Sequence, residues 1–140
     1  MDFFFYGTLL DPEVRRAVLG IGAAKLVLEP GRLRGYRRIA ARVTTVPGLV
    51  RQSGAVTEGL IARGIAAADA ERLDRYEGRG YRRIACAIQG AAGACPQALV
   101  YIAIRHRDAR GAPWSLARWQ RRHKRRYLRS IARWMAGGSR

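Results

Sequence analysis

The stretch LDRYEGRGYRR, residues 73–83, decides the fold prediction because it joins a short helix to a strand. The pattern predicts a helix over residues 69–77, with Asp69 as its N-cap and Gly78 as its stop. A strand is expected to follow from Tyr81 to Ile88. The junction places one carboxylate, Glu77, at the C-terminal end of the helix.

Glu77 occupies an unusual position for an acidic side chain. A carboxylate in the last helical turn faces the negative end of the helix dipole, which disfavours the anion and raises the pKa. A raised pKa would suit a group that takes and returns a proton near neutral pH. Nearby arginines would lower the pKa if they reached it, and these are Arg75, Arg79, Arg82 and Arg83. The alternative is a solvated helix end paired with one of them, which is the commoner arrangement.

The N-terminal residues predict a buried strand that ends in a turn. Residues 2–6 form a short, nearly continuous apolar run, and Tyr6-Gly7-Thr8-Leu9 stands at its exit. A glycine here permits an unusual backbone angle and the approach of a ligand, and exposed amides at such a turn can bind a carboxylate or an oxyanion. The alternative is an ordinary glycine at the end of a strand.

The remaining elements indicate an α+β fold. Asp11-Pro12 starts a helix that Gly20 ends, and residues 115–135 predict one long helix. Strands are expected at 25–28, 32–40, 43–46 and 56–61, with a turn at Pro30-Gly31, a bulge or close approach at Gly59, and a long-looped hairpin formed by 81–88 and 98–104. This order favours a small mixed β-barrel-like sheet flanked by helices, with a long basic C-terminal helix, in one domain over residues 1–140.

Charge separates the last quarter of the chain from the rest. The 140 residues include 27 Lys and Arg against 10 Asp and Glu, a formal net charge of +17. Residues 105–140 hold 12 basic residues and one acid, so they carry +11 of that excess. Such a surface attracts phosphate or nucleic acid, although a charge run is more often a solvated helix face.

Several function classes are disfavoured by what the sequence lacks. There is no apolar run of 18 residues and no secretory leader, so we expect a cytoplasmic protein without membrane contact. Two cysteines do not make a disulfide framework. The spacing of His106 and His123 suits no metal site, and no phosphate-binding glycine loop occurs. His123 falls on the apolar stripe of the last helix, which predicts a buried core histidine.

Three ordered motifs resemble the gamma-glutamylcyclotransferase-like (AIG2-like) family. They are Phe5-Tyr6-Gly7-Thr8-Leu9, then Glu58-Gly59-Leu60, then the LDRYEGRGYRR stretch, which matches the family pattern LDxxEGxxYxR at every fixed position. A late strand ending Leu99-Val100-Tyr101 also agrees. The resemblance covers about residues 2–104 and implies a barrel-like fold with one pocket.

The resemblance also implies an activity. Active members of the family release 5-oxoproline from gamma-glutamyl compounds, because the substrate's own α-amine attacks its γ-carbonyl and expels an amine or amino acid. Carried onto this chain, Glu77 is the general base and then the acid, the backbone of Tyr6, Gly7, Thr8 and Leu9 holds the glutamyl carboxylate or the oxyanion, and Tyr81 is a pocket wall. No cofactor or metal is expected, since the nucleophile is already tethered.

Two functions therefore stay open at the level of sequence. The favoured one is a cofactor-independent cyclotransferase that acts on a small gamma-glutamyl amine or gamma-glutamyl amino acid. The alternative is a non-catalytic module that binds anions or nucleic acid through the basic last helix. The tryptophans of that helix fall on its apolar stripe rather than on an exposed stacking face, which weakens the alternative. The sequence indicates neither the leaving group nor the oligomeric state.

Overall fold

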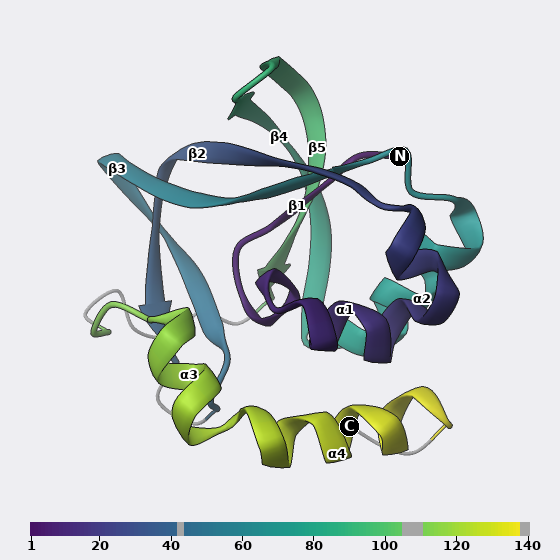
Figure 1. Ribbon diagram of the computed structural model, residues 1–140. Helices are drawn as coiled ribbons and strands as arrows, with labels where there is room; N and C mark the ends of the chain where they lie inside the picture. The colour runs from purple at the N-terminus through teal and green to yellow at the C-terminus, as the bar shows by residue number, and fades with distance from the viewer. Residues whose placement is uncertain (42–43, 105–110, 138–140) are drawn as a thin grey trace.

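In the part of the chain that the structure describes, five strands close into a barrel, and four α-helices lie against its side and its lower end (Figure 1). The computed structural model describes residues 1–41, 44–104 and 111–137. The strand order is β1-β3-β2-β4-β5, and β1 closes the barrel by pairing in parallel with β5. The strands are β1 (Phe3–Phe5), β2 (Val27–Ala40), β3 (Pro47–Arg63), β4 (Tyr81–Gly90) and β5 (Gly93–Ala103). The predicted α+β class is confirmed.

The short strand β1 is buried on both of its faces, as its unbroken apolar run predicts. It pairs with β3 on one side and with β5 on the other. Because successive side chains of a strand point to opposite faces, its three phenylalanines divide between two cores. Phe4 packs inside the barrel with Leu33, while Phe3 and Phe5 pack against the helices with Leu73. This strand therefore fixes the position of the turn that follows it.

The first two α-helices begin and end close to their predicted bounds. α1 (Pro12–Leu19) is capped by the Asp11 carboxylate, which accepts hydrogen bonds from two backbone N–H groups of its first turn. α2 (Ala67–Glu77) ends at Gly78, whose φ of 76° is in the left-handed region. The prediction that Asp69 caps α2 is wrong, because the helix begins two residues earlier and Asp69 lies in its first turn.

The predicted turn at Pro30-Gly31 is also wrong, since β2 continues through both residues. Pro30 lies opposite Leu60 in the β2–β3 ladder, but its carbonyl accepts a hydrogen bond from the Ala91 N–H at the tip of the next hairpin. The N and O atoms of one strand residue point to the same side, so the N–H that proline lacks does not belong to the β2–β3 ladder.

β3 is longer than the strand predicted at 56–61, and it does not include the strand predicted at 43–46. Residues 44–46 form a bend rather than a strand, and the strand begins at Pro47; Val43 lies outside the described residues. The predicted strand at 56–61 is confirmed as part of β3. The expectation of a close approach at Gly59 is confirmed too, because a Cβ there would collide with the carbonyl oxygen of Phe5.

The β4–β5 hairpin is tighter than predicted. Only Ala91 and Ala92 separate the strands, and Cys95 lies within β5 with its side chain buried. Cys86 pairs with Ala98 and Ile88 pairs with Cys95, so β5 has one residue more than β4 between these two pairs, and the register shifts there. The long loop expected from the Gly, Ala and Pro content is therefore a strand with a bulge.

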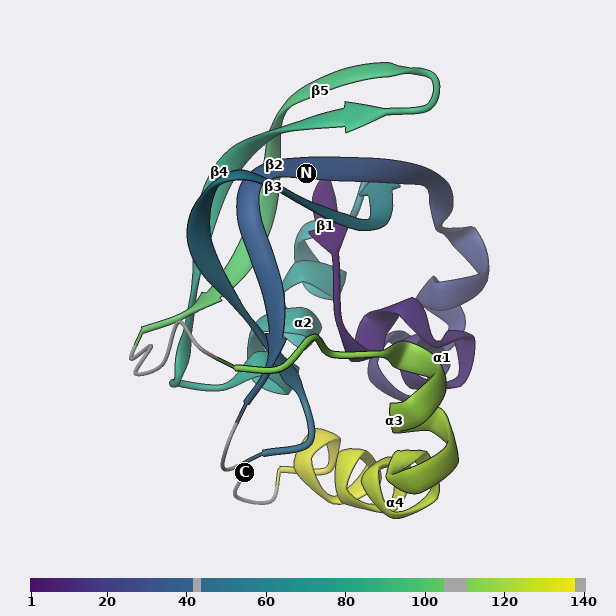
Figure 2. The ribbon, with the colours of Figure 1, turned by 90° about the vertical axis from the view of Figure 1, so that its left-hand side faces the viewer.

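The predicted long C-terminal helix is two helices, α3 (Leu116–Arg122) and α4 (Lys124–Met135), which break at His123. Figures 1 and 2 show them crossing the lower end of the barrel. Trp119 and Ile131 of the predicted stripe are fully buried. His123 is exposed, which corrects the expectation of a core histidine: its backbone leaves helical geometry at φ −128°. Within the part of the chain that the structure describes, no helix combines the length and apolar character needed to cross a membrane.

Candidate active site

A pocket opens where the exit of β1 meets the C-terminal end of α2. Its walls also include the beginning of β3, the beginning of β4, the end of β5 and one residue of α4. The enclosed cavity has a volume of about 30 Å³. The lining residues are Phe4, Phe5, Tyr6, Gly7, Thr8, Leu9, Val46, Pro47, Tyr76, Glu77, Tyr81, Tyr101 and Tyr127.

Every residue to which the sequence assigned a role in the site lies in this pocket. These residues come from two places that are far apart in the chain, Tyr6 to Leu9 on one side and Glu77 with Tyr81 on the other. The turn Tyr6–Leu9 leads into a short 3-10 helix over Thr8–Leu10. Glu77 reaches the same space because it is the last residue of α2, just before Gly78 reverses the chain toward β4.

Arginines outside the pocket hold the backbone of the turn. The Arg38 guanidinium on β2 donates a hydrogen bond of 2.8 Å to the Tyr6 carbonyl, and it also lies over the Trp114 ring. Arg15 on α1 donates to the carbonyls of Leu9 and Leu10 at 2.8 and 3.0 Å. Both ends of the turn are thus fixed by charged donors, which form stronger hydrogen bonds than neutral ones.

Close packing explains the glycine in the turn. A Cβ on Gly7 would lie 2.9 Å from the Cγ atom of Pro47, the first residue of β3. The φ of Gly7 is −124°, so the glycine is not required there by a left-handed backbone. The unusual backbone angle expected at Gly7 is its ψ of −132°, which lies outside the helical and extended regions, and the approach of Pro47 is what a side chain would disturb.

Tyrosine hydroxyls form two hydrogen-bonded groups around the pocket. In the first, the Tyr76 hydroxyl lies 2.5 Å from Thr8 Oγ1 and 2.7 Å from the Tyr127 hydroxyl. In the second, the Tyr6 hydroxyl donates to the Tyr101 carbonyl and the Tyr101 hydroxyl donates to Asp74, both at 2.6 Å. The Asp74 carboxylate is also paired with Arg83 at 3.2 Å. These bonds link the turn after β1 to α2, β5 and α4 across the pocket.

The electrostatics of the pocket keep these phenols protonated. Burial raises the pKa of Tyr6 well above its ordinary value, and the negative charge of Glu77 raises it further. The pKa of Tyr76 is raised by burial, then by Tyr127 and Glu77. Burial and the Asp74 carboxylate raise that of Tyr101, with a smaller contribution from Glu77. At neutral pH the tyrosines can donate hydrogen bonds but cannot act as bases.

Glu77 itself is half-buried in the pocket wall. Two of the nearby arginines are engaged elsewhere: Arg83 pairs with Asp74, and Arg75 lies 3.5 Å from the carbonyl of Met135. Among the described lining residues, Glu77 is the one carboxylate. A half-buried carboxylate beside protonated hydroxyls and a fixed backbone turn can exchange a proton with a bound amine.

Sequence reasoning did not assign a role in the site to Tyr76, Tyr101 or Tyr127. Tyr76 lies within the LDRYEG motif and Tyr101 ends the Leu99-Val100-Tyr101 segment, so a signal was present for both. Tyr127 lies on the apolar stripe of the last helix, where its spacing is the same as that of a core residue. Only the tertiary contact with Tyr76 distinguishes it from one.

The structure shows no metal-binding cluster among the residues it describes. No group of three His, Cys, Asp or Glu side chains lies close enough to hold an ion within residues 1–41, 44–104 and 111–137. His123 is exposed, and His106 lies outside the described residues. The thiol of Cys95 lies 3.5 Å from the Asp2 carboxylate, and burial raises the pKa of that thiol.

Solved structures with the same fold come from several organisms. A solution structure of an Arabidopsis thaliana protein matches with a TM-score of 0.68 at 21% identity, covering 97% of this chain and 84% of that one. A structure of a gamma-glutamyl cyclotransferase matches with a TM-score of 0.66 at 13% identity, covering 94% and 85%. An uncharacterized protein from Homo sapiens matches with a TM-score of 0.64 at 14% identity, covering 93% and 85%. At these identities the matches show the fold alone.

The comparison with family models is more specific than the comparison of folds. No curated protein matches the sequence significantly. The model described as gamma-glutamyl cyclotransferase, AIG2-like, matches residues 3–121, which include the turn, Glu77 and Tyr81. The chain therefore belongs to the AIG2-like gamma-glutamyl cyclotransferase family.

Proposed function

We propose that this protein is a cofactor-independent gamma-glutamyl cyclotransferase that releases 5-oxoproline from a gamma-glutamyl amine or gamma-glutamyl amino acid. The observation that carries the proposal is that Glu77, the one carboxylate among the described lining residues, shares a pocket with the turn Tyr6–Leu9. Family membership supports the general kind of activity.

In the proposed reaction, Glu77 moves the proton. Its carboxylate accepts a proton from the substrate's α-ammonium group, and the freed amine attacks the γ-carbonyl carbon. The new C–N bond closes a five-membered lactam, and the C–N bond to the leaving amine breaks as Glu77 returns the proton to that nitrogen. The second proton of the attacking nitrogen passes to the released amine, which leaves as an ammonium ion. A tethered nucleophile needs mainly orientation and deprotonation, so one acid–base residue and a binding turn are sufficient.

The turn supplies binding in this proposal. The backbone of Tyr6, Gly7, Thr8 and Leu9 holds the glutamyl carboxylate or the developing oxyanion, and Tyr81 forms part of the wall around the substrate. Arg38 and Arg15 keep the turn rigid, and a rigid donor needs little reorganisation when charge develops.

Replacing Glu77 with glutamine tests the proposal directly. The Glu77→Gln variant keeps the shape and the capacity to form hydrogen bonds but cannot carry the proton, so kcat should fall by about 10²–10⁴-fold. The measurement is 5-oxoproline release from a panel of gamma-glutamyl amines and amino acids. The matched control is Glu71→Gln, because Glu71 is exposed on α2 and does not line the pocket. Equal rates for wild type and Glu77→Gln would refute the assignment.

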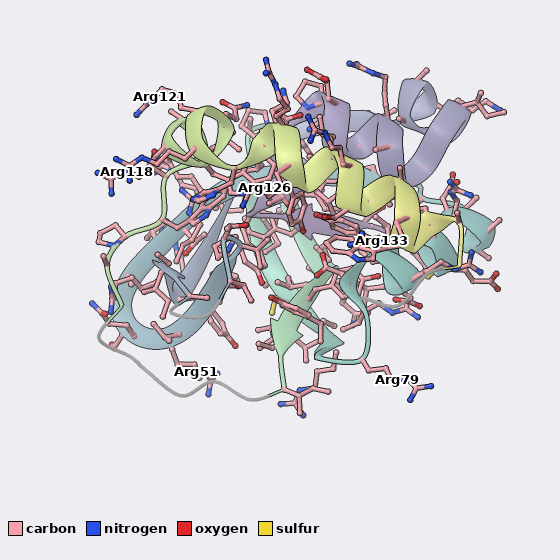
Figure 3. The ribbon with its side chains drawn as sticks, turned by 90° about the horizontal axis from the view of Figure 1, so that it is seen from below. Arg51, Arg79, Arg118, Arg121, Arg126 and Arg133 are labelled. Carbon is pink, nitrogen blue, oxygen red and sulfur yellow. The ribbon has the colours of Figure 1, made fainter. Side chains whose placement is uncertain are left out.

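A second candidate function is favoured by one observation. Eight basic residues and no acids lie between residues 115 and 135, and Figure 3 shows Arg118 and Arg121 extending away from the barrel. A surface of this kind binds polyanions through Coulomb attraction without sequence preference. This candidate does not use the pocket, so the two functions can be tested separately.

A further inference from the structure

The chain segment that leads into α3 lies beside the end of β2, close to the pocket but outside it. Ile39 of β2 pairs with Pro113 in an antiparallel bridge, and Figure 2 shows this segment crossing the lower part of β2. The next residue, Trp114, is 8% exposed, and its ring centroid lies 6.5 Å from that of Trp119 on α3. The Trp114 ring is therefore held by β2 on one side and by α3 on the other.

One contact of Trp114 reaches the turn of the pocket through Arg38. The Arg38 guanidinium lies 5.5 Å from the centre of the Trp114 ring, which is within the range of a cation–π contact. It donates hydrogen bonds to the carbonyls of Tyr6 and Glu58 at 2.8 and 3.2 Å. A trans peptide unit is planar, so its C=O and N–H point in opposite directions. Because the Tyr6 carbonyl is held on the guanidinium, the N–H of Gly7 in the same peptide unit points away from Arg38.

A second contact of Trp114 reaches another wall of the pocket. Its indole N–H donates a hydrogen bond of 3.0 Å to the Thr45 carbonyl, in the bend before β3. The next two residues, Val46 and Pro47, line the pocket. Pro47 is also the residue that packs against Gly7, where a Cβ would lie 2.9 Å from its Cγ atom. The two contacts of Trp114 therefore act on the two chain segments that meet at Gly7 and Pro47.

We propose that Trp114 is a positioning residue, which holds the turn Tyr6–Leu9 and the start of β3 in the relative positions that bind the glutamyl part of the substrate. The inference rests on the proposed function. Trp114 does not line the pocket itself, and Glu77 is placed by α2 rather than by these contacts. Loosening the contacts of Trp114 should therefore weaken substrate binding more than proton transfer, so that KM rises while kcat changes little.

The Trp114→Phe variant tests the contact with Thr45. Phenylalanine keeps an aromatic ring beside Arg38 but has no indole N–H, so the bend before β3 loses its donor. For the panel compound that wild type turns over fastest, we expect KM to rise about threefold to tenfold, as for one ordinary hydrogen bond, because binding must then order the bend. The value of kcat should stay within about twofold of wild type, because Glu77 keeps its place.

Trp119→Phe is the matched control. It removes the same atoms from a tryptophan that is 1% exposed, and the Trp119 indole N–H has no hydrogen-bond acceptor in the part of the chain that the structure describes. KM of this variant should therefore stay close to that of wild type. A partial loss of folded protein would lower the apparent kcat and leave KM unchanged, so the two constants separate positioning from folding.

A double-mutant cycle tests the contact through Arg38. Trp114→Leu removes the ring as well as the N–H, so KM should rise further than in Trp114→Phe. In Arg38→Met the link to the turn is already absent, and Trp114→Leu should therefore raise KM by a factor about two or more times smaller in that background than in wild type. Equal factors in the two backgrounds would refute the action of Trp114 through Arg38.

The outcomes separate this inference from the proposed function. Loss of turnover in Glu77→Gln together with a wild-type KM in both Trp114→Phe and Trp114→Leu would overturn the role of Trp114 and leave the proposed function intact. The role of Trp114 would also be overturned if Trp119→Phe raised KM as much as Trp114→Phe, or if Trp114→Phe lowered kcat alone. If wild type released 5-oxoproline from no compound of the panel, the proposed function would fail and this inference with it.

Discussion

At Gly7 the turn packs closely against Pro47, and this contact adds to the hydrogen bonds that Arg38 and Arg15 make with the turn. Because Pro47 is a rigid ring at the start of β3, a methyl group on Gly7 cannot be accommodated by a side-chain rotation. The turn would have to move instead, and with it the amides that bind substrate in the proposed function. We therefore expect Gly7→Ala to raise KM by about tenfold or more and to lower stability by about 1–3 kcal/mol.

The measurement is steady-state kinetics together with urea unfolding. Gly80→Ala is the matched control, because Gly80 precedes Tyr81 of the pocket wall but a Cβ on Gly80 meets no atom within 4 Å. The control should fold and turn over as wild type does. If Gly7→Ala has the KM of wild type, the turn does not hold the glutamyl end of the substrate.

The residues of the site differ in how readily the sequence reveals them. Glu77 and the turn stand in motifs whose order along the chain could be read directly. Arg38 could not be found in this way, because its function depends on β2 passing behind the exit of β1. The same holds for Tyr127, whose helical spacing is that of a core residue. Side chains that act through tertiary contacts leave no periodic signal.

At the scale of elements, Asp11 couples α1 to the C-terminal helices. Its buried carboxylate caps α1 and also contacts Lys124 at 2.8 Å and Gln120 at 2.8 Å. Burial opposes ionisation of Asp11, but the hydrogen bonds from Lys124, Gln120, Val14 and Glu13 outweigh it and hold the pKa below the ordinary value. One carboxylate thus stabilises a helix start and a contact between helices that are distant in sequence.

This lowered pKa predicts how stability depends on pH. A carboxyl group with a lower pKa in the folded state contributes stability above its unfolded pKa of about 3.9, and this stability is lost as the pH falls through the folded pKa. Asp11→Asn keeps a good N-cap but removes the charge, so it should cost about 1.5–3 kcal/mol at pH 7. Below about pH 4 the difference from wild type should shrink.

Urea unfolding of both proteins between pH 2.5 and 8 provides the measurement. The exposed acid Glu71 supplies the control, since Glu71→Gln should leave the pH profile unchanged. A difference between wild type and Asp11→Asn that is constant across this range would show that the charge of Asp11 does not stabilise the fold.

The elements themselves show which sequence signals are local and which are not. The start of α1 could be predicted because its cap and its proline act within a few residues. The continuation of β2 through Pro30 could not, because it depends on the hairpin tip that contacts the proline carbonyl. The break at His123 is likewise absent from the helical stripe, which runs through this residue without interruption.

For the whole molecule, the net charge of +17 is unevenly distributed over the fold. The pocket wall has one carboxylate among the described residues, while α3 and α4 carry basic groups and no acid. Charge of this kind acts through long-range attraction that salt screens, whereas the proposed chemistry depends on short contacts inside the pocket. The two properties should therefore respond differently to ionic strength and to substitution.

Substitution of exposed arginines on α3 should separate polyanion binding from turnover in the pocket. Replacing Arg118 and Arg121, both exposed on α3, with glutamine should weaken binding of a single-stranded oligonucleotide and reduce the slope of log K against log salt by about 1.4. Turnover of a gamma-glutamyl substrate should not change, because neither arginine lines the pocket. The control is the pair Arg51→Gln and Arg82→Gln, which removes the same charge from β3 and β4 and should leave the affinity closer to that of wild type. Fluorescence anisotropy of a labelled oligonucleotide between about 50 and about 500 mM salt measures the affinity and its salt slope for both variant pairs. Binding that persists at the highest salt concentration and depends on neither pair would require contacts other than Coulomb attraction, and would favour nucleic-acid binding as the main function.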